Sequence, residues 1–298
     1  MTLRTGIVAL EAPADPLAWR DRVRAVDDQG HDVLLMADHL GMWPPFTPLV
    51  AAAQASDRLR FGTQVLNIDF WNPVLLAREV AAADVLTGGR LEVGFGAGHA
   101  AVEYAAAGIG YDRPAVRIGR LAEAVPIVRR LLAGETVDHH GEHYRCERAE
   151  IGIAPTQQPV PVMIGGNGDR LLRLAAAEAD IVGLTGFTAG TGRTHTDLSH
   201  FTWDGLADRI AHVRRHGGTG ALSVLVQHVE ITGDRRAAAA AFAQGQVDVD
   251  VVADSPFVLL GSEAGVAEQL ARLQAAGVSY VTAFERSAAA LARAVDRT

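Results

Sequence analysis

Short apolar runs alternate with alanine-rich helical patterns along most of the chain, and no other feature limits the fold so strongly. The first four apolar runs begin roughly 28 to 30 residues apart, about the length of one β-α unit. They cover residues 5–10, 32–36, 60–66 and 90–95. Helical patterns lie between them, at residues 16–28, 45–56 and 73–86. Repeated β-α units predict a parallel sheet covered by helices.

The second half of the chain repeats this scheme with longer insertions. Its predicted strands are 160–164, 181–184, 221–227 and 278–284, and its predicted helices are 169–179, 203–215, 234–244 and 288–295. Eight strands with following helices in 298 residues predict an α/β fold: a (β/α)₈ TIM barrel with loop insertions, as a single domain over residues 1–298. An open doubly wound sheet is the alternative. The insertions are 139–150, 186–202 and 246–256, and the last two are candidates to cover a substrate.

The chain contains no lysine. A Walker A phosphate loop, a pyridoxal phosphate Schiff base and a lysine-dependent aldolase are therefore excluded, because each needs an amine that arginine cannot replace. The chain also lacks the Gly-x-Ser-x-Gly and His-Glu-x-x-His motifs, so serine hydrolases and zinc proteases have no signature here. The net charge of −8 argues against a nucleic-acid surface.

Other sequence features indicate the cellular compartment of the protein. No apolar run approaches the length of a membrane span, and the first residues lack the order of regions that makes a signal peptide. Cys146 is the only cysteine, so an internal disulfide is impossible. We therefore expect a cytoplasmic protein with no membrane partner.

The fourth apolar run ends in Gly94, Gly96 and Gly98, followed directly by His99. Glycine has no side chain and tolerates positive φ, so such a strand end lets a flat ligand approach the backbone. A nicotinamide dinucleotide site is an alternative, but its fingerprint needs a third glycine where this chain has His99. The pattern therefore indicates another flat cofactor.

Polar residues also follow other predicted strands, at the edge where barrel enzymes hold their sites. Asp38 and His39 follow the second strand, with Trp43 close behind. A lone Asp-His pair is more often structural, but the strand-end position favours a functional pair. The fifth strand ends in Gly165, Gly166 and Asn167, directly before a helix. Free N–H groups at a helix start bind phosphate, and a plain tight turn is the alternative.

The histidine-rich stretch at residues 139–143 looks like a metal site at first sight. Its surroundings favour a small solvated hairpin turning at His140 and Gly141, so no metal site is predicted. A nearby set of charged residues has helical spacing and indicates a charged face with ion pairs. The set is Arg113, Arg117, Arg120 and Glu123.

Several stretches together resemble the bacterial luciferase-like superfamily of flavin and deazaflavin enzymes. They are residues 90–98, the run Tyr111-Asp112-Arg113-Pro114 with Arg117, Arg120 and Glu123, Leu131-Leu132-Ala133-Gly134 with Gly141-Glu142-His143-Tyr144, and residues 159–166 leading to Ala177-Glu178-Ala179-Asp180. The resemblance implies a (β/α)₈ barrel with a tricyclic cofactor across the carboxyl ends of the strands.

Asp38 and His39, followed by Trp43, look like the branch that uses coenzyme F-420, a 5-deazaflavin. This resemblance implies that Asp38 and His39 contact the deazaflavin. The position of Gln64 and Val65 often carries a non-prolyl cis peptide that supports the ring. The other cofactor-binding residues implied are Asn67, Ala97, Gly98, His99, Tyr104, Gly165, Gly166 and Asn167, the last three at the phosphate.

Two departures from the sugar-phosphate dehydrogenase of this branch change the expected substrate. His99 stands in place of an acidic residue beside the ring, and Val102 in place of a polar contact. The sugar-phosphate pocket of that enzyme also contains lysine, which this chain lacks. Glucose 6-phosphate is therefore not the expected substrate.

The predicted reaction is hydride transfer between reduced F-420 and a small organic substrate, with reduction of a C=C or C=N bond as the preferred direction. Asp38 and His39 are the predicted catalytic residues: a protonated His39, held by Asp38, stabilises negative charge on the ring. His99, Tyr104 or water supplies the proton. The alternatives are an FMN-dependent monooxygenase and a non-catalytic flavin-binding protein. Alanine-rich helices at 45–56 and 73–86 and the dimers common in the superfamily imply a homodimer.

Overall fold

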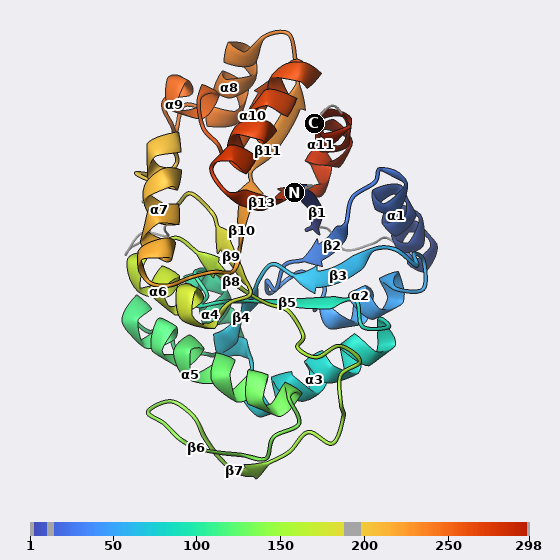
Figure 1. Ribbon diagram of the computed structural model, residues 1–298, viewed down its shortest axis with the longest axis vertical. Helices are drawn as coiled ribbons and strands as arrows, with labels where there is room; N and C mark the ends of the chain where they lie inside the picture. The colour runs from blue at the N-terminus through green and yellow to red at the C-terminus, as the bar shows by residue number, and fades with distance from the viewer. Residues whose placement is uncertain (1–2, 11–14, 188–197, 297–298) are drawn as a thin grey trace.

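The computed structural model describes residues 3–10, 15–187 and 198–296. At its centre, parallel strands form one sheet in the order β3-β2-β1-β13-β10-β9-β8-β5-β4 (Figure 1). β3 also pairs with β5, which closes the sheet into a ring. Because the short β4 follows β3 along β5, the ring has eight strand positions. The (β/α)₈ barrel is confirmed, and the open doubly wound sheet is wrong.

All the strands predicted for the barrel are present. They are β1 (Arg4–Ala9), β2 (Val33–Met36), β3 (Arg60–Thr63), β4 (Leu66–Asn67), β5 (Leu91–Gly96), β8 (Val162–Gly166), β9 (Ile181–Leu184), β10 (Ala221–Val226) and β13 (Val278–Phe284). Successive side chains on a strand point to opposite faces, and the buried side chains accordingly fall into two clusters. The larger one packs the strands against the surrounding helices. The third predicted strand is interrupted at Gln64 and Val65.

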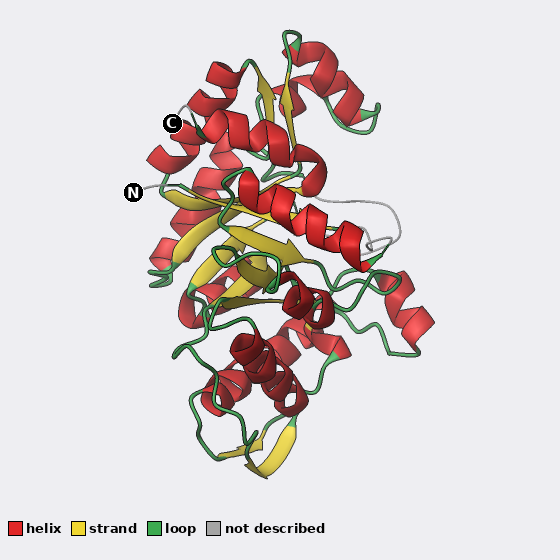
Figure 2. Cartoon of the chain, turned by 90° about the vertical axis from the view of Figure 1, so that its right-hand side faces the viewer, coloured by secondary structure: helices red, strands yellow, loops and turns green. Residues whose placement is uncertain are grey.

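Helices surround the barrel, as Figure 2 shows. They are α1 (Pro16–Asp28), α2 (Phe46–Ala52), α3 (Pro73–Leu86), α4 (Ala101–Ala107), α5 (Pro114–Leu132), α6 (Asp169–Glu178), α7 (Trp203–Arg215) and α11 (Ala288–Val295), with the 3-10 turns η1 (Ile68–Phe70) and η2 (Glu285–Ser287). α1 and α3 begin where the sequence predicts, because the side chains of Asp15 and Asn72 accept N–H bonds from their first turns and a proline follows each cap. Within the described ranges, every helix is too short or too polar to cross a bilayer.

The segment between β10 and β13 is only partly predicted by the sequence. It contains β11 (His228–Ile231), α8 (Arg235–Ala243), α9 (Val249–Ala253), β12 (Val258–Gly261) and α10 (Glu263–Ala275), in the upper part of Figure 1. β11 and β12 pair in parallel outside the barrel sheet, and neither they nor α10 were predicted. The insertion at 246–256 is not a free loop, because it holds α9, which packs on α8 and β12. Of the insertion at 186–202, residues 188–197 lie outside the described residues.

The histidine-rich stretch forms the predicted hairpin. Its strands β6 (Val137–His140) and β7 (Arg145–Ala149) pair antiparallel below α5 in Figure 1. Glu123 of α5 anchors this hairpin: its carboxylate accepts hydrogen bonds of 2.9 to 3.2 Å from backbone N–H groups in the turn. In the part of the chain that the structure describes, no group of three or more His, Cys, Asp or Glu side chains is arranged to hold a metal ion.

Neutralising Glu123 should weaken this anchor in a pH-dependent way. Burial by itself raises the pKa of Glu123, but hydrogen bonds from His139 and from the backbone of the turn outweigh it, so the pKa is lowered from 4.5. A lowered pKa stabilises the folded state above pH 4.5, and this contribution is lost as the pH falls through the folded-state value. We expect Glu123→Gln to reduce the free energy of unfolding by about 1–3 kcal/mol at neutral pH.

Urea unfolding of wild type and variant at neutral pH and at about pH 3 measures this difference, which should shrink in acid. Glu147→Gln is the matched control, since Glu147 forms an exposed pair with Arg145 and should contribute less than about 1 kcal/mol. A difference of equal size at both pH values would contradict the anchoring role of the Glu123 carboxylate.

Candidate active site

The predicted site residues follow four neighbouring barrel strands. Asp38 and His39 follow β2, Gln64 and Val65 join β3 to β4, and Ala97, Gly98 and His99 follow β5. Gly165 and Gly166 end β8, and Asn167 follows it. β2 pairs with β3, β3 with β5, and β5 with β8, all in parallel. The carboxyl ends of these strands therefore lie at one edge of the barrel, and the residues share that edge.

Val65 fills the space beside the glycines of β5 and β8. The Gln64–Val65 peptide bond is cis. A Cβ atom on Gly96 would lie 2.6 Å from Val65 Cγ2, and one on Gly165 would lie 3.0 Å from Val65 Cγ1. The glycine pattern predicted strand ends open to a ligand, but Gly96 and Gly165 leave room for the Val65 side chain instead. The half-buried Val65 side chain therefore occupies the space beside both glycines.

Asp38 does not hold His39. Its Oδ2 accepts hydrogen bonds from Trp71 Nε1 at 2.8 Å and from the backbone N–H of Asn67 at 3.2 Å. Burial raises the pKa of Asp38, and these two bonds act against that rise. Asp38 therefore fixes the turn that follows β4, which corrects the pairing expected from the sequence.

His39 is held by Glu103 of α4. His39 Nδ1 lies 2.7 Å from Glu103 Oε1, and the backbone N–H of Leu40 donates to Glu103 Oε2 at 3.3 Å. The ring of His99 stands edge-on to that of His39, with 5.4 Å between the centroids. Burial lowers the pKa of His99, and the neighbouring His39 lowers it further. These contacts give His39 a fixed ring orientation at the barrel mouth.

Tyr104 lies beneath Gly98 instead of at the mouth. Its side chain is fully buried, and its hydroxyl lies 3.0 Å from Asn67 Oδ1 and 3.1 Å from Asp69 Oδ2. Burial and the nearby Asp69 carboxylate raise the pKa of Tyr104. A buried, weakly acidic phenol is a poor proton donor, so Tyr104 supports Gly98 and the proton-donor role expected for it is withdrawn.

Removing the Tyr104 hydroxyl should therefore affect folding more than turnover. We expect Tyr104→Phe to lower the free energy of unfolding by about 0.5–1.5 kcal/mol and to change turnover less than about threefold, whereas a lost proton donor costs about 10²- to 10⁴-fold. Urea unfolding and steady-state kinetics measure the two effects. A loss of activity in the larger range would restore Tyr104 as a proton donor.

The turn after β8 contains a buried amide without a partner. Asn167 is 3 % exposed, and neither its side-chain oxygen nor its side-chain nitrogen makes a hydrogen bond. α6 starts two residues later at Asp169, and Gly168 at its N-cap position provides no side-chain cap. An unpaired buried polar group costs about 1–3 kcal/mol, and uncapped N–H groups at a helix start attract anions. The turn therefore fits a bound anionic group that would satisfy both.

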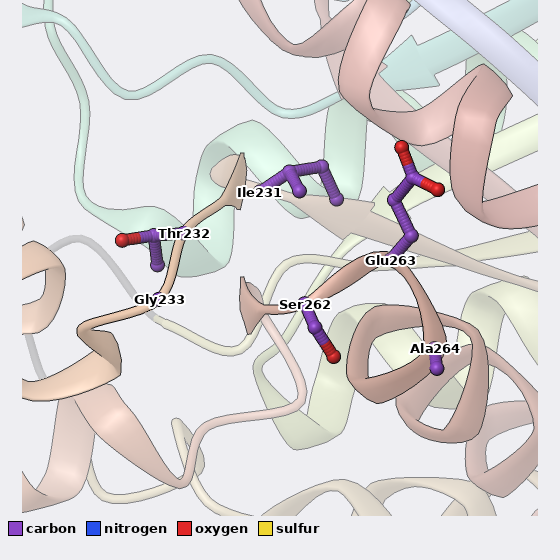
Figure 3. Close-up of a pocket in the computed structure, with 6 residues that line it drawn as sticks. All are labelled: Ile231, Thr232, Gly233, Ser262, Glu263 and Ala264. Atoms are coloured by element: carbon purple, nitrogen blue, oxygen red, sulfur yellow. The ribbon is translucent and has the colours of Figure 1, made fainter.

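A hollow of about 480 Å³ lies elsewhere, at the carboxyl ends of β11 and β12 (Figure 3). It is lined by Ile231, Thr232, Gly233, Ser262, Glu263 and Ala264. Ser262 in its wall caps α10 by accepting a bond from the backbone N–H of Gly265. None of the predicted site residues lines this hollow, so the candidate site is the barrel mouth.

The family follows from a match over most of the chain. A sequence model of the luciferase-like monooxygenases matches residues 3–247. This chain belongs to the luciferase-like monooxygenase family. The resemblance found in the sequence is therefore confirmed.

Several relatives of this luciferase-like chain have names that specify a reaction, and three of them illustrate the match. The chain is 30 % identical over 222 residues to an F-420-dependent glucose-6-phosphate dehydrogenase of Nakamurella multipartita, over 72 % of this chain and 63 % of the relative. It is 29 % identical over 201 residues to the enzyme of the same name from Gordonia bronchialis, over 64 % and 58 %. It is 30 % identical over 158 residues to a 5,10-methylenetetrahydromethanopterin reductase of Archaeoglobus fulgidus, over 53 % and 46 %. The chain thus matches less than two thirds of the length of each.

Solved structures share the whole luciferase-like fold. The coenzyme F-420-dependent tetrahydromethanopterin reductase of Methanopyrus kandleri superposes with a TM-score of 0.78 at 16 % identity, over 100 % of this chain and 99 % of that one. An F-420-dependent secondary alcohol dehydrogenase in complex with an F-420-acetone adduct gives 0.79 at 18 % identity, over 99 % of both. The FMN complex of the oxygenating constituent of 3,6-diketocamphane monooxygenase from Pseudomonas putida gives 0.71 at 14 %, over 99 % and 96 %. At these identities the likeness concerns the fold alone.

Two site residues of this luciferase-like chain were not found from the sequence. Glu103 lies in the segment after the fourth strand, and its position past a strand end was the available signal. Arg117 was assigned to a charged helix face, but it is buried, and its Nε donates to the carbonyl of Ala97 at 3.1 Å. It therefore fixes the backbone next to Gly98. Arg120 does form the expected ion pairs, with Asp69 and Asp112.

Proposed function

We propose that this chain is an F-420-dependent oxidoreductase that transfers a hydride between the coenzyme and a small organic substrate. One observation carries the proposal: an oriented histidine, His39, shares one edge of the barrel with the apolar Val65 surface and the Asn167 turn. These are the parts that a flat redox ring with an anionic tail requires. The printed names of the sequence relatives support F-420 as that group.

Separate residues would hold the two ends of the coenzyme. Val65 would contact the ring, with Gly98 and Ala97 beside it, and the residues at the phosphate would be Gly165, Gly166 and Asn167. When bound, F-420 supplies or accepts a hydride at carbon 5 of its ring. Glu103 holds Nδ1 of His39. The other ring nitrogen, Nε2, would stabilise negative charge on the ring or exchange a proton at the mouth. His99 and water remain the candidate proton donors.

Reduction of a C=C or C=N bond is the direction we propose, with reduced F-420 as donor. A sugar phosphate is a poor fit, since the chain has no lysine and has Val102 where the sugar-phosphate dehydrogenase has a polar contact.

An FMN-dependent monooxygenase is the second candidate, favoured by the family description and by the FMN-bound structural neighbour. Titration of the purified protein with oxidised F-420 and with FMN, followed by fluorescence, separates the two. We expect F-420 to bind at least about tenfold more tightly. Tighter binding of FMN would favour the monooxygenase, and binding of F-420 without hydride transfer to any of a panel of enones and imines would favour a non-catalytic binding protein.

We also propose a homodimer formed through α3. This helix leaves three apolar side chains exposed, Leu75, Val85 and Leu86. Leu75 and Leu86, about three helical turns apart, are 52 % and 58 % exposed. Sedimentation equilibrium should give twice the mass of 31.5 kDa, and Leu75→Asp should shift the protein towards monomer. A monomeric wild type would contradict the proposal.

A further inference from the structure

We propose that Glu103 is the positioning residue of His39 and that it fixes the proton on Nδ1. The inference rests on the proposed function only where it concerns turnover. His39 Nδ1 and Glu103 Oε1 are 2.7 Å apart. The Glu103 side chain is 15 % exposed and that of His39 is 30 % exposed, so water competes weakly for this hydrogen bond.

The contact selects one form of the imidazole. A carboxylate is only an acceptor, so Nδ1 must carry a proton whenever the bond is made. In neutral His39, Nε2 is then left as an acceptor, and in the charged form both nitrogens are donors. Either way, the nitrogen that gains or loses a proton is Nε2.

The carboxylate itself is held in place. Its second oxygen accepts the backbone N–H of Leu40, the residue after His39. One carboxylate therefore holds both the imidazole of His39 and the backbone beside it. The neighbouring acid Asp38 has other partners, since its Oδ2 accepts from Trp71 Nε1 and from the backbone N–H of Asn67.

His99 lies beside the His39–Glu103 pair. It stands edge-on to His39, and burial and the charge of His39 both disfavour its protonation. This arrangement makes the orientation of one imidazole depend on a residue 64 positions away in the chain.

The test uses the complete protein labelled with ¹⁵N-histidine. Long-range ¹H–¹⁵N spectra distinguish a protonated from an unprotonated ring nitrogen, and His39→Gln identifies the His39 signals. In wild type at mildly alkaline pH we expect Nδ1 to be protonated and Nε2 to be bare. Glu103→Ala should move the proton towards Nε2, whereas Glu103→Gln should keep it on Nδ1, because the amide oxygen can still accept. Glu230→Gln, which changes the separate His228–Glu230 pair, should leave the His39 signals unchanged.

A bare Nδ1 in the wild type, or an unchanged tautomer in a folded Glu103→Ala, would overturn the proposal. The wild-type spectrum decides the question even if Glu103→Ala does not fold. With F-420 bound, Glu103→Ala should lower kcat by about 10- to 100-fold, as loss of an orienting partner does at other sites, with less than about a threefold change in the coenzyme dissociation constant. Because the spectra need no coenzyme, failure of F-420 to bind would overturn the proposed function and leave this inference intact.

Discussion

Replacing His39 by alanine is expected to slow hydride transfer by about 10²- to 10⁴-fold, the usual contribution of a positioned acid or base. His39 is 30 % exposed and makes its side-chain hydrogen bond at the barrel mouth. Its loss removes little core packing, so the free energy of unfolding should fall by less than about 1 kcal/mol. Single-turnover kinetics with reduced F-420 measure the first effect, and urea unfolding measures the second.

His140→Ala is the matched control for this variant. His140 is exposed on the β6–β7 hairpin, so its removal should leave both kinetics and stability as in the wild type. If His39→Ala transferred hydride at the wild-type rate, His39 would have no part in the mechanism. If it unfolded instead, the histidine would be structural.

Introducing a side chain at Gly98 should remove coenzyme binding and destabilise the fold. Gly98 has a φ of +69°, and an added Cβ atom would collide with Tyr104 Oη and Asn67 Oδ1. The positive φ costs a non-glycine residue about 1–2 kcal/mol, and forced overpacking typically costs about 1–3 kcal/mol more. We therefore expect Gly98→Ala to lower the free energy of unfolding by roughly 2–5 kcal/mol.

Gly134→Ala separates the two contributions. Gly134 has a φ of +82°, but no atom lies within 4 Å of the Cβ that alanine would add. This control should lose only the conformational part, about 1–2 kcal/mol, and should bind F-420 normally in the fluorescence titration. Equal losses of stability in both variants would mean that Tyr104 and Asn67 move aside at little energetic cost to admit the added methyl group. Normal coenzyme binding by Gly98→Ala would exclude this strand end from the cofactor site.

Much of the fold could be read from local patterns. The strand at 181–184 and the helices at 16–28 and 73–86 were predicted with their observed bounds. The strand was found because a short apolar run is typical of a buried strand. The two helices were found because Asp15 and Asn72 cap their first turns. The segment between β10 and β13 was predicted less completely. β12 and α10 pack on one another outside the barrel. They were missed because the prediction assigned one strand and one helix to each β-α unit, and this unit contains more.

The site was predicted as a set of positions, not as a set of contacts. Asp38, His39, Gly98 and Asn167 do follow the strand ends at one edge of the barrel. Their partners differ from the expected ones, since the glycines of β5 and β8 admit Val65. A glycine pattern has the same appearance in sequence whether a ligand or a neighbouring side chain fills the space.

The sequence by itself determined the order of the β-α units, the barrel and the family, because each depends on patterns repeated along the chain. Only the tertiary structure decided which polar groups meet. Asp38 and His39 are adjacent in sequence, yet Asp38 binds Trp71 and His39 binds Glu103, 64 residues away. The reason is geometric: neighbouring residues at a strand end point in opposite directions, and the parallel β2, β3 and β5 bring α4 to the side that His39 faces.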